Sequence, residues 1–264
     1  MDEPRAPGEQ ATPSARLVLA PNAGPMTLDG TNSYVLAAPG ASGVIVVDPG
    51  PADAAHLARL AGFGPVELVL VTHHHADHVA GLDEFHRMTD APVRAVDPAF
   101  CFAAEPLGDS ELIRVAGLEL HVMATPGHTA DSVCFVLPDD GEYGSVLTGD
   151  TILGRGTTII ADPDGALGPY LHSLGRLRAL GAPGPTTVLP GHGPVLPDLA
   201  AVCADYLAHR AERLDQVRAA LLALGDDAST ASVTDVVYVD TDASVRGAAE
   251  ASVRAQLRYL KGTV

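Results

Sequence analysis

The 264-residue sequence is poor in lysine, cysteine and long apolar runs, and each shortage argues against a class of structure or partner. No uninterrupted apolar stretch reaches the roughly 18 residues of a transmembrane helix, so no membrane span is expected. The N-terminus carries Asp2, Glu3 and Glu9 without an apolar core, which is not typical of a secretory signal. The three cysteines are widely spaced, so neither a disulfide framework nor a CxxC motif is visible. A reducing, cytoplasmic location is therefore predicted.

Positive charge is also scarce, with 16 lysine and arginine residues against 33 acidic ones and a formal charge of -17. Lys261 is the only lysine. An acidic surface repels polyphosphate, so RNA is a disfavoured partner, although a local basic patch could act alone. The apolar content of 47% is enough to bury a core, and nothing indicates an oligomeric state.

Short apolar runs alternate with helix-like segments along most of the chain. Strands are expected at 16–20, 32–38, 43–48, 66–71, 93–96, 118–124, 133–137, 145–148 and 187–189. Helices are expected at 52–60, 79–88, 170–180, 231–238 and 243–260, with a long helix capped by Asp198 and reaching about 224. This order predicts an α/β (α+β) fold of two packed sheets with helices outside. Residues 1–14 are expected to be a flexible lead, 15–205 a catalytic domain and 206–264 a small helical C-terminal unit.

Ligand-type side chains gather where the expected strands end. A dense segment follows the run 66–71, and three more such residues each come directly after a glycine, which permits a tight turn at a sheet edge. Imidazole and carboxylate groups in this pattern suit a borderline cation such as Zn²⁺, with Mn²⁺ or iron as alternatives. The candidate ligands are His73, His75, Asp77, His78, His128, Asp150 and His192.

These residues divide into two sets of three and one shared acid. One metal would take His73, His75 and His128; the other would take Asp77, His78 and His192; Asp150 would bridge the two. Such a pair of ions binds and deprotonates a water between them, so we interpret the site as catalytic, with Asp77 and Asp150 as catalytic residues. The simpler alternatives are a surface histidine run or a closed structural zinc site, but the latter often uses cysteine.

Four of these segments resemble the metallo-β-lactamase superfamily: His73-His74-His75-Ala76-Asp77-His78, Pro126-Gly127-His128, Gly149-Asp150-Thr151 and Pro190-Gly191-His192-Gly193. The resemblance covers about residues 16–205. It implies an αββα sandwich with metals at the sheet edges. It also suggests that Asp48 supports a metal-bound histidine, although a turn or cap role is equally open.

Further segments, at 149–158, 170–174 and 206–210, look like the β-lactamase-like protein 2 branch, which carries a winged-helix-like C-terminal unit. Little sequence follows the last expected helix, so the unit is interpreted as a truncated version without the β-wing. The branch resemblance implies either thioesterase-like hydrolases or endoribonucleases.

Three residues near these motifs are left with open roles. His74 should point away from the ligands by strand alternation. Arg155 could bind an anionic substrate group or pair with a nearby acid. His209 could reach the substrate opening or act structurally.

The sequence therefore favours a metal-dependent hydrolase that uses a metal-bound hydroxide on a small ester or thioester. A single-strand endoribonuclease and a metal-binding protein without turnover are the alternatives.

Overall fold

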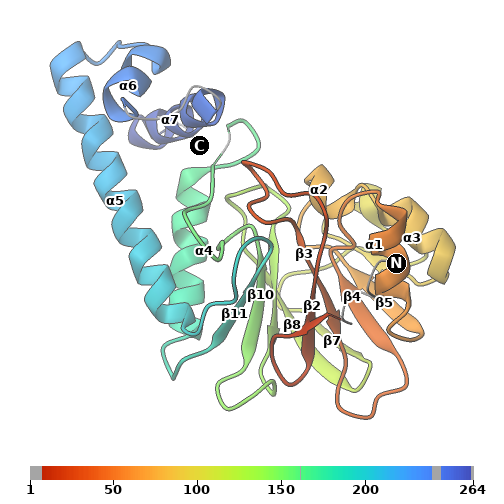
Figure 1. The fold of residues 1–264 in the computed structure, drawn as a ribbon. Coiled ribbons are helices and arrows are strands. Elements are labelled where there is room, and N and C mark those ends of the chain that lie inside the picture. The colour runs from red at the N-terminus through yellow and green to blue at the C-terminus, as the bar shows by residue number, and fades with distance from the viewer. Residues whose placement is uncertain (1–7, 161, 240–244, 263–264) are drawn as a thin grey trace.

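The computed structural model describes residues 8–160, 162–239 and 245–262. Two sheets stand at the centre of the molecule (Figure 1). The first sheet has the order β1-β2-β3-β4-β5-β6: β1 (Glu9–Gln10), β2 (Ala15–Leu19), β3 (Asn32–Leu36), β4 (Val44–Val47), β5 (Val66–Leu70) and β6 (Val93–Arg94). The second has the order β11-β10-β9-β8-β7: β11 (Thr187–Pro190), β10 (Ser145–Gly149), β9 (Val133–Leu137), β8 (Leu118–Ala124) and β7 (Leu112–Val115).

Helices cover the outer face of each sheet. The first sheet is covered by α1 (Ala54–Ala61), α2 (Ala76–Val79) and α3 (Leu82–Thr89), with a 3₁₀ turn at Pro98–Phe100. The second is covered by α4 (Leu167–Leu180) and the long α5 (Leu199–Leu224), followed by α6 (Thr230–Val237) and α7 (Arg246–Leu260). No helix among the described residues is long and apolar enough to cross a membrane.

Three buried clusters hold these layers together, and a fourth lies in the C-terminal helices. Between the sheets, side chains such as Leu36 and Leu70 from one meet Leu120 and Phe135 from the other. Outside the first sheet, Phe85 and its neighbours pack on the strands; outside the second, α4 and α5 do the same. The fold is therefore the expected αββα sandwich, because each sheet buries apolar side chains on both faces.

The structure differs from the sequence expectation at two places in the sandwich. The expected helix 79–88 begins only at Leu82, as α3, and Val79 instead ends the separate helix α2. Between them Gly50 donates to the His78 carbonyl at 3.0 Å and accepts from Gly81 N at 2.9 Å. Strand β7 was not expected; it is only four residues long and is held by antiparallel pairing with β8. Four residues are too few for a clear periodic pattern.

The expected flexible lead is ordered over its described part, residues 8–14. Strand β1 pairs with β2, which places Glu9 opposite Leu17. Farther along, the Asp140 carboxylate accepts from Ser14 N at 2.9 Å and from Thr12 Oγ1 at 2.5 Å. These polar bonds to a distant loop, which sequence periodicity does not reveal, fix the segment in place. The remaining residues of that expected lead, 1–7, lie outside the described residues.

The described residues after 205 form three helical segments joined by turns and contain no strand. Asp198 caps α5 as expected, accepting from Ala201 N at 3.0 Å. This helix runs across the expected boundary at 205/206 without a break. Its second half packs on α6 and α7 through a small apolar cluster that includes Val217, Val233 and Val253. Of the expected helix 243–260, residues 243–244 lie outside the described part and the rest forms α7 from Arg246 onward.

A buried histidine in α1 makes stability depend on pH. His56 is 1% exposed, and its Nε2 lies 2.9 Å from Ser33 Oγ. Burial, assisted by Arg59, lowers the pKa of His56 from 6.5 to about 4. Above pH 6.5 the ring is neutral whether folded or unfolded. As the pH falls, the unfolded chain takes up a proton first, so stability is lost between about pH 6.5 and 4.

We expect the unfolding free energy of the wild type to fall by about 2 kcal/mol more than that of His56→Gln between pH 7.5 and 5. Urea unfolding in the presence of a chelator measures this difference, because titration of the remaining histidines is common to both proteins. Equal pH dependence of the two proteins would show that the folded and unfolded states protonate His56 alike.

Candidate metal centre

Strand β5 leads directly into the histidine segment, which lies at the edge of the sheet. Beyond Leu70, the chain turns through Thr72, and His73 and His75 follow before α2 begins. Asp48, at the end of β4, holds this turn: its carboxylate accepts from Thr72 N at 2.8 Å and from Thr72 Oγ1 at 2.6 Å. The carboxyl ends of the parallel strands β4 and β5 meet here, so both segments reach one edge.

Glycines let the second sheet bring its ligand-type residues to the same edge. Gly127 has φ +145, and a Cβ there would lie 2.4 Å from Tyr170 Cα. Gly149 has φ +47, and its Cβ would lie 2.5 Å from Thr72 Oγ1. A side chain at either position would therefore push apart the backbone that carries His128 or Asp150.

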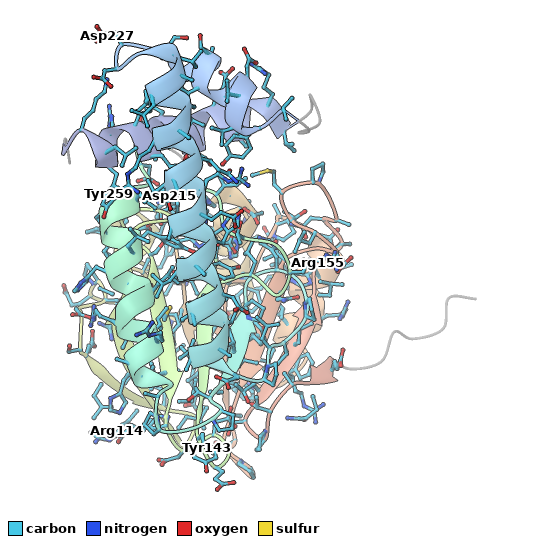
Figure 2. All side chains as sticks on the ribbon, turned by 90° about the vertical axis from the view of Figure 1, so that its left-hand side faces the viewer. Arg114, Tyr143, Arg155, Asp215, Asp227 and Tyr259 are labelled. Carbon is cyan, nitrogen blue, oxygen red and sulfur yellow. The ribbon has the colours of Figure 1, made fainter. Side chains whose placement is uncertain are left out.

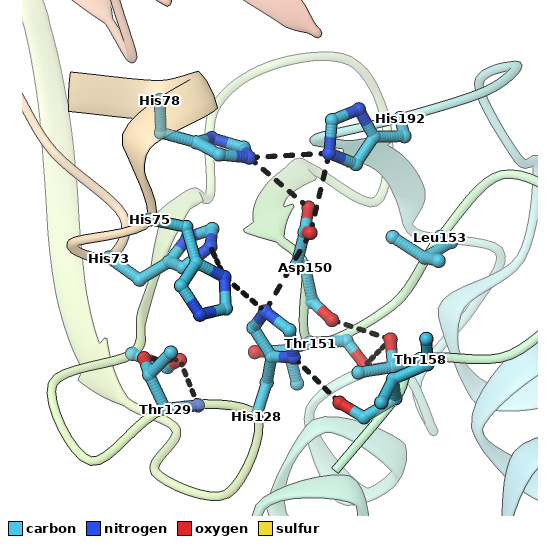
Figure 3. Close-up of polar contacts among 12 residues, drawn as sticks. His73, His75, His78, His128, Thr129, Asp150, Thr151, Leu153, Thr158 and His192 are labelled. Atoms are coloured by element: carbon cyan, nitrogen blue, oxygen red, sulfur yellow. Dashed lines mark hydrogen bonds and ion pairs between the residues drawn. The ribbon is translucent and has the colours of Figure 1, made fainter. Parts of the chain in front are cut away.

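One cluster contains four residues whose donor atoms all lie within 4.8 Å of one another (Figure 3). His75 Nδ1 is central: it lies 3.1 Å from His73 Nε2 and 3.0 Å from His128 Nε2. Asp150 Oδ2 completes the group at 3.7 Å from His128 Nε2. Side chains from β5's end, the turn after β8 and the end of β10 therefore converge on one point.

The second cluster consists of Asp77, His78 and His192. Asp77 Oδ2 lies 3.3 Å from His78 Nε2 and 3.1 Å from His192 Nε2. Asp150 reaches this cluster as well, with Oδ1 at 3.5 Å from His78 Nε2 and Oδ2 at 3.3 Å from His192 Nε2 (Figure 3). A single carboxylate, that of Asp150, thus faces both clusters.

The Nδ1 atoms of three histidines contact oxygen atoms that lie outside the two clusters. His78 Nδ1 lies 2.9 Å from Asp48 Oδ2, His128 Nδ1 lies 2.8 Å from the Ile159 carbonyl, and His192 Nδ1 lies 3.1 Å from the Gly30 carbonyl. Each acceptor favours a proton on Nδ1, which leaves Nε2 as the ring nitrogen that faces the clusters and can bind a cation once it has lost its proton. The expected partnership of Asp48 with a histidine of the site is thus geometrically present.

The electrostatics of the two clusters differ. Burial and the neighbouring His78 hold the pKa of His73 well below its ordinary value. Burial lowers the pKa of His192 too, but the carboxylates of Asp150 and Asp77 outweigh it and raise the value to about 9. For Asp150 burial raises the pKa, while His78 and His192 outweigh it, so the carboxyl stays ionised. The site therefore concentrates negative charge between imidazole rings.

These groups fit divalent cations. Inward-facing lone pairs at 3.0–3.1 Å, as between His75 and both His73 and His128, repel one another unless a proton or cation lies between them. In addition, Asp150 Oδ1 is buried and makes no hydrogen bond. A buried carboxylate oxygen without a hydrogen bond is costly, and a cation satisfies it. Nitrogen and oxygen donors in this mixture suit zinc, manganese or iron.

The other residues singled out in the sequence lie outside the two clusters. His74 Nδ1 lies 2.8 Å from Asp131 Oδ1, but His74 also forms a third possible ligand group with His75 and Asp164, so it borders the first cluster. Arg155, on the surface in Figure 2, pairs with Asp29 at 3.0 Å, which is one of its two expected roles. His209 lies on α5 beside Thr157–Ile159, outside both clusters.

Sequence reasoning missed several groups that support the site. Thr31 Oγ1 donates to Asp77 Oδ2 at 3.2 Å, and Thr31 is itself held by Asn22. The carbonyls of Gly30 and Ile159, described above, are main-chain acceptors, so no side-chain pattern could have marked them. Thr31 carries no sequence signal either, because its contact with Asp77 depends on the path of the loop 20–31.

Comparison with known proteins agrees with this geometry. Residues 26–192 match the model of the metallo-beta-lactamase superfamily. The chain therefore belongs to that superfamily, and it is a hydrolase of the metallo-beta-lactamase fold. It is 31% identical over 266 residues to a beta-lactamase-like protein 2 homolog from Caenorhabditis elegans, covering 96% of this chain and 86% of the relative. It is also 31% identical over 222 residues to an atrochrysone carboxyl ACP thioesterase from Aspergillus chevalieri, covering 81% and 67%.

Solved structures show the same fold. A metallo-beta-lactamase family protein from Thermus thermophilus superposes with a TM-score of 0.76 and 25% identity, covering 95% of this chain and 94% of that one. A protein solved in a di-iron-bound form superposes with a TM-score of 0.55 and 26% identity, covering 70% and 96%. The superfamily resemblance expected from the four metal motifs is confirmed.

Proposed function

We propose that this protein hydrolyses a small thioester, or a related ester, with two divalent cations held at the sheet edge. The observation that carries the proposal is Asp150, a buried carboxylate that faces two ligand clusters and leaves Oδ1 without a hydrogen bond. Zinc is the first choice of metal because of the histidine-rich donors, with manganese or iron as alternatives.

The ligand sets follow the two clusters. His73, His75 and His128 would hold one cation; Asp77, His78 and His192 would hold the other; Asp150 would contact both. Bound together, such ions supply hydroxide at neutral pH and polarise the carbonyl oxygen of the substrate. Asp48 would orient His78 through its 2.9 Å contact.

The chain's own acids take part in the chemistry. In thioester hydrolysis, water oxygen bonds to the carbonyl carbon, the carbon–sulfur bond breaks, and the thiol leaves with a proton. Asp77 is half-buried, and the imidazoles of His192 and His78 outweigh burial to hold its pKa far below the ordinary value. It therefore stays ionised and orients the attacking water by accepting a hydrogen bond, while Asp150 fixes the two clusters relative to each other.

A cavity of about 150 Å³ opens next to this site. His128 and Asp150 line it together with apolar side chains from the loop 20–31 and from the loop after β10, namely Met26, Leu28 and Leu153. Apolar walls beside a polar centre suit an acyl group whose carbonyl lies at the ligands. The thioesterase relatives support the same substrate class.

We expect hydrolysis of acyl-thioesters that depends on metal. The purified protein, tested on a panel of acyl-pantetheine thioesters, should lose its turnover in a chelator and recover it when zinc or manganese is added back. Release of free thiol measures the rate. His128→Ala should show the same loss without a chelator, because it removes a donor from the first cluster.

A matched control is His121→Ala, an exposed histidine on β8 that contacts Glu119 and not the clusters. It should keep wild-type turnover. Absence of metal-dependent thiol release over the whole panel would count against the thioester proposal. Turnover that survives chelation and loss of His128 would contradict the metal mechanism itself.

Single-stranded RNA is a second candidate substrate. The observation in its favour is a basic cluster, Arg210 and Arg213 on α5, beside the loop 157–159. We rank it below the thioester because the chain as a whole carries a charge of -17. Metal-binding without turnover ranks last, since all seven donors converge in the structure.

We also propose the division into a catalytic domain, residues 15–205, and a C-terminal unit, 206–264. Support comes from the small separate cluster of α5, α6 and α7, although α5 belongs to both parts. A reducing, cytoplasmic location remains part of the proposal. It is supported by Cys134 and Cys203, which are buried and unpaired.

A further inference from the structure

A second cavity, of about 190 Å³, lies where the loop 157–159 meets helices α5, α6 and α7. Its walls include the hydroxyl residues Thr157, Thr158 and Ser252, the basic residues Arg210 and Arg213, and His209. None of the described residues that line it is acidic. In a chain with 33 acidic residues, this concentration of donors is unusual.

The two arginines of this cavity differ from most others in the chain. Eight arginines form ion pairs with carboxylates: Arg87, Arg94, Arg114, Arg155, Arg176, Arg218, Arg246 and Arg258. Among the described residues, no carboxylate pairs with Arg210 or Arg213. Arg213 donates to the neutral acceptors Gln216 Oε1 at 2.7 Å and Val237 O at 3.2 Å. Within the part of the chain that the structure describes, the two guanidinium groups are thus balanced by no carboxylate and instead lie over the rings of Tyr170 and Tyr238.

Two residues that line the cavity also carry a buried nitrogen without a hydrogen-bond partner. Arg210 is 4% exposed; its Nη2 donates to the Thr158 carbonyl, but its Nε makes no hydrogen bond. His209 Nδ1 is likewise buried without a partner. Burial, with Arg210 and Arg213 nearby, lowers the pKa of His209, so the ring is neutral and can present an N–H at this atom. Unpaired buried donors beside uncompensated charge are what an anion-binding site requires.

The loop 157–159 joins this cavity to the candidate metal centre. Thr157, Thr158 and Ile159 line both cavities. Thr158 Oγ1 donates to the Asp150 carbonyl at 2.5 Å, and the Ile159 carbonyl lies 2.8 Å from His128 Nδ1. Figure 3 shows Thr158 beside Asp150 and His128. A bound substrate could therefore place its reacting bond at the metal-ligating side chains and an anionic group against α5.

We propose that this cavity binds the phosphate of a thioester's carrier arm, such as pantetheine 4′-phosphate. Arg210 and Arg213 supply the charge, and His209 and the threonine hydroxyls supply neutral donors. The proposal rests on the proposed thioester hydrolysis and narrows it: the acyl group enters the cavity beside Asp150, and the arm crosses the loop 157–159. Substrates without the phosphate lose these contacts.

The test compares acyl-pantetheine with acyl-pantetheine 4′-phosphate in wild type and Arg213→Gln. In the zinc-loaded wild type, kcat/KM should be about tenfold or more higher for the phosphorylated thioester. Arg213→Gln should lose most of this preference. His209→Leu is a second variant that should reduce it. Arg218→Gln is the matched control, because Arg218 lies on the same helix but pairs with Asp215 outside the cavity.

Binding of pantetheine 4′-phosphate, measured by calorimetry, separates this proposal from the proposed function. If neither thioester is hydrolysed, thioester hydrolysis fails, and Arg213-dependent binding of the phosphate alone still supports the cavity. Equal kcat/KM for both thioesters, with binding unaffected by Arg213→Gln, overturns the cavity proposal and leaves thioester hydrolysis standing. Arg213-dependent cleavage of a single-stranded RNA, without preference between the thioesters, also overturns it and assigns the cavity to RNA phosphate.

Discussion

Replacing Asp150 by alanine is expected to lower kcat/KM for thioesters by on the order of 10³-fold or more. The reason is that Asp150 faces His78, His128 and His192 at 3.3–3.7 Å and is the one acid among the described residues that reaches both clusters. Its loss should also lower the zinc content of the purified protein. Thiol release and elemental analysis measure the two effects, and Asp150→Asn, which keeps the shape, should follow Asp150→Ala.

Folding should largely survive this substitution. The alanine variant loses the contacts of Asp150 with His78 and His192, but it also avoids the cost of burying the carboxylate. Because these two effects oppose each other, thermal unfolding in a chelator should stay near the wild-type midpoint. Asp215→Asn is the control: this exposed acid on α5, labelled in Figure 2, pairs with Arg218 and should keep full activity. An Asp150→Ala protein that is unfolded with or without zinc would instead assign the site a structural role.

Adding a methyl group at Gly191 is expected to displace two of the candidate metal ligands. A Cβ there would lie 2.4 Å from Asp150 Oδ1 and 2.9 Å from His78 Cε1, so both side chains would have to move. We expect Gly191→Ala to weaken zinc binding by about 10- to 100-fold and to lower turnover with it. Competition with a chromophoric chelator measures the affinity. The backbone at Gly191 is not in the left-handed region, so the effect reports the contact itself.

Gly175→Ala is the matched control for this glycine substitution. Gly175 lies in the exposed middle of α4, and no atom lies within 4 Å of a Cβ built there. Alanine should leave zinc affinity unchanged and stabilise the helix by about 1 kcal/mol. If Gly191→Ala binds zinc as tightly as the wild type, the close packing of Asp150 against residue 191 does not govern the site.

Much of this centre follows from sequence because its residues stand at strand ends. His73 and His75 come after an apolar run, and the glycines before His128, Asp150 and His192 mark tight turns. Such local signals need no knowledge of the tertiary fold. The two-sheet architecture was predictable for the same reason, since most strands are continuous apolar runs.

The parts that escaped prediction depend on distant contacts. Thr31 meets Asp77 across 46 positions of sequence, and Thr12 meets Asp140 across 128. Neither pair has a local pattern, because a single hydroxyl–carboxylate bond fits many chain paths. The split between α2 and α3 likewise depends on the backbone of Gly50. Arg213 was missed because an arginine on a helix usually lies in solvent. It becomes notable only because no carboxylate of the described residues pairs with it.

The length of helix α5 limits where this protein can be joined to a relative in a chimera. Its 26 residues make a continuous rod of about 39 Å. Near one end Tyr206 Oη accepts from Leu153 N at 2.9 Å, in the middle Arg210 bonds Thr158, and near the other end Val217 packs on α6 and α7. A crossover at residue 205 would separate Tyr206 and Arg210 from their partners in the sandwich, whereas Val217 would keep its packing on α6 and α7. Joining chimeras at Gly225 instead would keep α5 whole, with Tyr206 and Arg210 still attached to the sandwich, and would exchange only the segment that carries α6 and α7.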